Sequence, residues 1–199
     1  MRRTLLVLGM VMVAGAPAYA QVPGINVHLG ARAGVFSPLS PLAETTQGDL
    51  KLKNGLGIGA SIELDIPLSP VNVRANVDAA MGAKLELEDT ELEGAEVDVI
   101  AFTGDLVFRP LPRIVVVQPY LLAGAGVKRY SFDADGTSFG EDRSHFTGHL
   151  GAGADFKLGP IAVLAELSDY ISSFKNEGTD DSKLQNDVFL MVGFRIGML

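Results

Sequence analysis

The sequence predicts an all-β protein, an eight-stranded antiparallel up-and-down transmembrane β-barrel, on three observations. Apolar and polar residues alternate along most of the chain, which is the period of a strand with two different faces. Short and long connections also alternate, as they do in transmembrane barrels. The N-terminus is typical of an exported protein, and no later apolar run reaches the roughly 20 residues of a membrane-spanning helix. A membrane would therefore be crossed by strands.

Composition indicates one domain of ordinary length and excludes several classes of protein. The chain has 199 residues, of which 47% are hydrophobic and 20% charged, so disorder is not expected. It carries 16 basic and 24 acidic residues, and this acidic balance argues against a nucleic-acid partner. The absence of cysteine removes disulfides, thiolate zinc sites, cysteine nucleophiles and lipid attachment through an N-terminal cysteine.

The first 20 residues have the three parts of a secretory signal peptide. Arg2 and Arg3 precede an apolar stretch over 4–16, and Ala18-Tyr19-Ala20 forms a small-x-small cleavage site. A membrane anchor is the alternative, but Pro17 interrupts the apolar stretch too early. We therefore expect a cleaved signal peptide over 1–20 and a barrel domain over 21–199.

The first three strands are expected over 25–35, 56–66 and 71–88, where alternation is clearest. In the third, the odd positions from Val71 to Leu87 are apolar, which places Lys84 on the polar face. The short connection 67–70 between the second and third strands contains two prolines, which withhold donors from a ladder. These two strands are therefore predicted to form a hairpin.

Five further strands complete the predicted barrel. Segments 145–158, 161–167 and 188–198 alternate clearly, whereas 97–109 and 114–130 are apolar on both faces in places, so their register stays open. The other short connections are 109–113 and 158–160. Four longer polar connections are predicted to be loops on the opposite rim: 37–54, 88–96, 131–145 and 173–187.

Alternation does not say which face is the core, because a soluble lipocalin-type barrel has the same period with its apolar face inward. Glycine on the polar face favours the membrane barrel, since a narrow lumen is crowded. The chain also lacks the tryptophan expected in the first strand of a lipocalin. The polar-face glycines are Gly30, Gly34, Gly57, Gly59, Gly82, Gly151 and Gly153.

Aromatic residues near strand ends give a further indication of a membrane. Outer-membrane barrels carry aromatic girdles at both interfaces with water. The residues predicted to form these girdles are Phe36, Phe108, Tyr120, Tyr130, Phe132, Phe146, Phe156 and Tyr170.

Charged residues on the polar face are predicted to point into the lumen. An ion path and a salt-bridged plug are both consistent with them, and we favour the plug because eight strands leave an interior just wide enough for side chains. The predicted lumen charges are Arg32, Arg74, Lys84 and Arg195 with Glu63, Asp65, Asp78, Asp105, Asp155 and Glu166.

Three segments resemble strands of a known group of proteins. These are Gln118-Pro119-Tyr120 leading into the small-residue stretch 123–126, the strand 151–156, and Glu166 to Tyr170. Over 21–199 the chain resembles the small eight-stranded outer-membrane β-barrel proteins of Gram-negative bacteria, the OmpA/OmpX/OmpW-like superfamily. Such barrels commonly end in an outward aromatic residue, whereas Leu199 here shares parity with Arg195 and not with Phe194.

This resemblance implies a structural or surface-contact role in the cell outer membrane, exerted through four extracellular loops. It implies a monomer without catalytic, cofactor-binding or metal-binding residues. The expected partners are outer-membrane lipid and lipopolysaccharide, the barrel-assembly machinery and periplasmic chaperones. A narrow porin-like channel for small solutes is the first alternative, and a lipid A-modifying enzyme is the second.

Histidines and acidic loops are the remaining candidates for chemistry. His149 with Ser168 or Glu166 could be proposed as a deacylase site, but His149 and Glu166 lie on lumenal parity, away from lipid. His28 and His145 are the other histidines. Acidic side chains suit calcium or magnesium, but their spacing does not match a calcium loop, so a solvated surface is expected. They are Glu86, Glu88, Asp89, Glu91, Glu93 and Glu96 in one loop, and Asp133, Asp135, Glu141 and Asp142 beside Gly136 in another.

Overall fold

The computed structural model describes residues 26–40, 43–45, 48–87, 90–111, 115–134, 137–138, 143–175 and 182–198. The predicted signal peptide 1–20 lies outside these ranges. Among the described residues, no helix is long and apolar enough to cross a membrane. Eight long strands form the wall: β1 (Asn26–Pro38), β4 (Gly55–Asp65), β5 (Val71–Leu87), β6 (Thr90–Phe108), β7 (Val117–Ala134), β9 (Arg143–Leu158), β10 (Ile161–Lys175) and β11 (Ser182–Met198).

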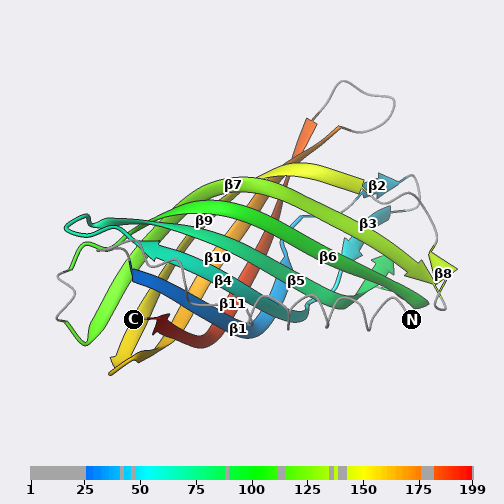
Figure 1. Ribbon diagram of the computed structural model, residues 1–199. Helices are drawn as coiled ribbons and strands as arrows, with labels where there is room; N and C mark the ends of the chain where they lie inside the picture. Colours follow the sequence, from blue (N-terminus) through cyan, green and yellow to red (C-terminus); the bar gives the residue numbers. More distant parts are fainter. Residues whose placement is uncertain are drawn as a thin grey trace.

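Each long strand pairs antiparallel with the next in the chain, and β1 closes the barrel by pairing with both β4 and β11. The closing ladder runs from Val27 opposite Met198 to Pro38 opposite Asp187. Three short strands extend the wall at one end: β2 (Ala43–Thr45), β3 (Gly48–Leu52) and β8 (Thr137–Ser138). The predicted eight-stranded antiparallel up-and-down barrel is confirmed (Figure 1).

The apolar face of the wall points outward and the polar face points inward. On β11, Leu190, Val192 and Phe194 are 56%, 61% and 51% exposed, whereas Arg195 is buried. The same contrast separates Leu64 from Glu63 on β4. An apolar exterior around a polar interior is the arrangement of a transmembrane barrel and the reverse of a lipocalin.

The two ends of the barrel differ, and the tight turns lie together at one of them (Figure 1). β4 and β5 are joined by residues 66–70, and β9 and β10 by Gly159 and Pro160 alone. Outer-membrane barrels have short periplasmic turns, so we call this the periplasmic end.

The loops predicted at the opposite, extracellular end are largely strand. β5 runs to Leu87 and β6 starts at Thr90, so the predicted loop 88–96 is wrong over 90–96, which belong to β6. The predicted loops 131–145 and 173–187 are shortened in the same way, while 37–54 contains β2 and β3. Strands of 15 to 19 residues exceed the roughly 10 that span a bilayer, so they extend beyond it as hairpins.

A β-bulge in β5 reverses its two faces. Ala80 pairs with Val99 and Ala83 with Val97, so two residues of β5 oppose one residue of β6. Gly82 has φ +64°, a conformation that favours glycine, and its N–H donates to Asp98 at 2.9 Å. Beyond the bulge Ala83 and Leu85 are buried and Lys84 is exposed. The predicted lumenal position of Lys84 is therefore wrong.

Only part of the predicted aromatic girdle lies on the outer face. Phe108, Phe146 and Phe156 are exposed there, whereas the side chain of Phe132 lies outside the described set. The girdle positions predicted for Phe36, Tyr120, Tyr130 and Tyr170 are wrong because these four side chains fill the lumen. The tyrosine hydroxyls find carboxylate acceptors there: Glu166 for Tyr120, Asp187 for Tyr130 and Asp78 for Tyr170.

Candidate functional site

The periplasmic half of the lumen contains a network of buried charges with Glu63 at its centre. Arg74 Nε donates to Glu63 at 3.0 Å and Arg109 Nη2 at 2.9 Å. Asn72 Nδ2 donates to the same carboxylate at 2.8 Å, and Arg195 Nη1 lies 2.9 Å from it. Glu63 has no exposed surface, so its charge is stabilised by these donors and not by bulk water.

The network connects strands that are not neighbours in the wall, and the bond between β5 and β10 crosses the barrel. Arg74 of β5 donates to Glu166 of β10 at 2.5 Å, and Arg32 of β1 donates to Asp78 of β5 at 2.6 Å. Asp155 accepts from Arg109 at 2.6 Å and from Arg195 at 2.7 Å. We define the charged layer as four arginines and four carboxylates: Arg32, Arg74, Arg109 and Arg195 with Glu63, Asp78, Asp155 and Glu166.

The charged layer is balanced in formal charge, and an aromatic ring packs within it. The guanidinium carbons of Arg74 and Arg109 lie 5.0 and 4.7 Å from the centroid of the Tyr120 ring. The Tyr120 hydroxyl donates to Glu166 at 2.8 Å. Planar guanidinium groups that are both paired and stacked are held in place, which suits a structural network.

The middle of the lumen holds His149, whose ring stacks on that of Tyr170 with centroids 4.2 Å apart. His149 Nδ1 lies 2.9 Å from Asp105, which also accepts from Asn76. The Ser168 hydroxyl has no hydrogen-bond partner among the described residues. The candidate base is thus engaged by a carboxylate, and the structure shows no hydrogen bond between it and the candidate nucleophile.

The extracellular half of the lumen is filled mainly by apolar side chains. Rings of Phe36 and Phe189 pack at 4.9 Å, and the ring of Tyr170 meets that of Phe189 edge-on at 5.4 Å. A buried ion pair joins Lys128 Nζ and Asp187 at 2.5 Å. We define the apolar layer as the buried cluster of Phe36, Leu52, Ala80, Ala83, Leu85, Val97, Val99, Ala101, Tyr130, Tyr170, Phe189 and Met191.

Nine of the ten charges predicted to face the lumen do so, and Lys84 is the exception already described. The nine buried groups are Arg32, Arg74, Arg195, Glu63, Asp65, Asp78, Asp105, Asp155 and Glu166. Sequence reasoning misses Arg109, Lys128 and Asp187. The first two lie in or next to the segments of open register, and Asp187 lies where a loop is predicted.

The remaining candidates do not form a metal site within the described part of the chain, where no group of three or more potential ligands is found. His28 Nε2 lies 3.1 Å from Asp65. The His145 ring meets the Tyr130 ring edge-on at 6.4 Å between centroids. The side chains of the two predicted acidic loops lie largely outside the described set, so the solvated surface expected for them stays a prediction.

Comparison with known proteins identifies the group to which this barrel is related. The family model described as "Outer membrane protein beta-barrel domain" matches residues 4–195. The chain belongs to this family. Membership of the outer membrane β-barrel family assigns the protein to the outer membrane, in agreement with the apolar exterior. No protein with curated annotation matches the sequence.

Solved structures similar to this member of the family are small outer-membrane barrels. Neisserial surface protein A is 14% identical, with a TM-score of 0.60 over 89% of this chain and 99% of that one. OprG from Pseudomonas aeruginosa is 15% identical, with a TM-score of 0.58 over 88% and 96%. A major outer membrane protein from Thermus thermophilus is 13% identical, with a TM-score of 0.61 over 87% and 99%. At these identities the likeness concerns the fold.

Proposed function

We propose that the protein is a non-conducting outer-membrane barrel with a structural and surface-contact role. The observation that carries this proposal is the filling of the lumen by two successive layers, the charged layer and the apolar layer. Charges that are paired with each other leave no continuous path for hydrated ions, and the apolar layer adds a dehydrated barrier.

The contact role is proposed for the hairpins that extend the wall beyond the bilayer. In many proteins the binding residues lie on loops that a rigid scaffold holds in position. Here the closed barrel is that scaffold. We further propose a monomer without cofactor or catalytic activity. Its partners would be outer-membrane lipid and lipopolysaccharide, with the barrel-assembly machinery and periplasmic chaperones needed only during biogenesis.

Conductance in planar bilayers tests whether the lumen is closed. The unaltered protein should give no steady current. A variant with small residues in the apolar layer alone (Phe36→Ala with Phe189→Ala) should stay closed, because the charged layer remains. Adding Arg74→Ser and Glu166→Ser should produce a current. Steady current through the unaltered barrel, with an ion preference that changes when Arg74 or Glu166 is neutralised, would establish the channel alternative instead.

Thiol labelling tests which end faces the cell exterior, and the absence of native cysteine makes single labels unambiguous. Ser173→Cys, in the β10–β11 hairpin, should react with a membrane-impermeant maleimide on intact cells. Ser69→Cys, in the turn between β4 and β5, is the matched control and should react only after permeabilisation. The reverse pattern would contradict the proposed contact role of the hairpins.

A further inference from the structure

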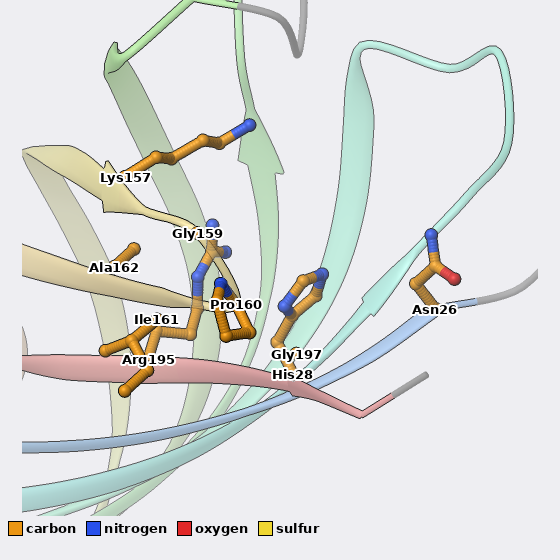
Figure 2. Close-up of a pocket in the computed structure, with 9 residues that line it drawn as sticks. All are labelled: Asn26, His28, Lys157, Gly159, Pro160, Ile161, Ala162, Arg195 and Gly197. Atoms are coloured by element: carbon orange, nitrogen blue, oxygen red, sulfur yellow. The ribbon is translucent and has the colours of Figure 1, made fainter.

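A cavity of about 370 Å³ opens at the periplasmic mouth of the barrel. Its polar lining consists of Asn26 and His28 from β1, Lys157 from β9 and Arg195 from β11 (Figure 2). Pro160 of the tight turn and Ala162 of β10 form an apolar part of its wall. The volume lies within the range of small-molecule sites, about 300–1,000 Å³. Apart from Arg195, no residue of the charged layer or the apolar layer lines this space.

The lining groups favour an anion. Asn26, His28, Lys157 and Arg195 all carry N–H donors, and no carboxylate is among the described residues that line the cavity. The acidic groups next to it are engaged: Asp65 lies against His28 at 3.1 Å, and Asp155 accepts from Arg195 at 2.7 Å.

The Arg195 side chain retains donor capacity despite its ion pairs. It is only 6% exposed, and its Nη1 lies 2.9 Å from Glu63 in the charged layer. Its Nη2 donates to Asp155, but its Nε has no hydrogen-bond partner among the described residues. Figure 2 shows the guanidinium between Lys157 and His28. A guanidinium N–H beside a lysine ammonium is suited to binding phosphate oxygens.

The position of the cavity along the barrel axis places it next to the lipid headgroups. Leu158 and Ile161, on either side of the two-residue turn, are 56% and 42% exposed on the outer face. The apolar belt therefore reaches the turn itself. Because a strand rises about 3.3 Å per residue, the cavity mouth lies within one or two residues of the belt's edge. Basic pockets at this depth are suited to phospholipid headgroups.

We propose that this periplasmic cavity binds a phosphate group, carried by a glycerophospholipid headgroup or by a free phosphate monoester. The phosphate oxygens accept hydrogen bonds from Lys157 and Arg195, with His28 and Asn26 at the side. The glycerol moiety rests on Pro160 and Ala162. This site is independent of whether the lumen conducts.

Titration of the folded barrel with glycerol 3-phosphate in dodecyl maltoside tests the proposal, because this detergent has no phosphate. Amide resonances of Gly159, Ala162 and Gly197 should shift in a saturable manner, and sodium chloride at equal ionic strength should not reproduce the shifts. Lys157→Gln should weaken binding about tenfold, the loss expected for one charge-assisted hydrogen bond. Arg129→Gln removes a cation from an exposed position of β7 near the other end and should leave binding unchanged.

The source of the phosphate is decided in nanodiscs. If a lipid headgroup occupies the cavity, the Lys157→Gln substitution should remove a response of the Gly159 and Gly197 amides to phosphatidylglycerol. If only the monoester binds, glycerol 3-phosphate should shift these amides and phosphatidylglycerol should not. His28→Gln, checked for folding by gel mobility, provides a second variant and should also weaken binding. Shifts that do not saturate, or that are equal in Lys157→Gln and Arg129→Gln, would overturn the proposal.

Discussion

Glu63→Gln should destabilise the barrel more than any surface change, because it removes a buried negative charge. The size of the side chain stays the same, so the loss of charge is the main change. Three arginines then face one carboxylate fewer: Arg74 and Arg109 lose a charged acceptor, and Arg195 loses an ion-pair partner at 2.9 Å. Breaking a buried ion pair by removing one partner costs about 3–5 kcal/mol. With Glu63 fully buried, we expect a loss near that range in the free energy of unfolding.

Equilibrium unfolding in urea, followed by the gel mobility of unboiled samples in lipid vesicles, measures this loss. Arg109→Gln is the informative second change, since Arg109 Nη2 donates to both Glu63 oxygens, at 2.9 and 3.1 Å. The double variant restores formal neutrality at this point. It should lose at least about 1 kcal/mol less than the sum of the two single variants, as coupled residues do. Additive losses, or a cost below about 1 kcal/mol for Glu63→Gln, would show that the residues of the charged layer are not energetically coupled.

Three further changes test the assignment of faces. Val77→Arg, on the outer face of β5, should reduce stability by about 2–4 kcal/mol if the site lies at mid-membrane. The control Val77→Ala should insert normally. Equal insertion of both variants would mean that this face does not meet lipid. Gly59→Leu should impair folding because a Cβ there would collide with the Asp78 carboxylate, while Ala60→Leu on the opposite face should not, and gel mobility distinguishes them. Lys84→Cys should react with an impermeant maleimide on intact cells, and Leu85→Cys should not. The reverse result would contradict the bulge between Ala80 and Ala83.

The wall of the barrel can be predicted from the sequence, but the exact face of every residue cannot. Period-two alternation depends only on local sequence, so it places Glu63 and Arg74 correctly. A bulge shifts parity by one residue without interrupting the apolar pattern, and the signal at Gly82 is a single glycine. Leu85 inside and Lys84 outside follow from that one residue.

Lumen filling can be predicted only in part, because tyrosine is compatible with either face. Near a strand end it suits a lipid interface as well as a polar interior, and only the acceptors Glu166, Asp187 and Asp78 distinguish the two. Those acceptors come from strands distant in sequence, as in the Tyr170 to Asp78 bond across 92 residues. The hairpin extensions escape prediction for another reason: acidic, polar segments have the composition of loops even when they pair as strands.

The cross-barrel bonds described above also constrain assembly. Arg74 and Glu166 are 92 residues apart, as are Asp78 and Tyr170, and both bonds join β5 to β10 on opposite sides of the barrel. Each bond therefore requires distant strands to have met. A curved sheet missing any one hairpin would leave guanidinium and carboxylate groups without their partners, each at the penalty of an orphaned charge. The barrel therefore closes between β1 and β11 in the same step in which its interior charges find their partners. Insertion should proceed without long-lived partial barrels, and separately expressed halves should remain unfolded until they are combined.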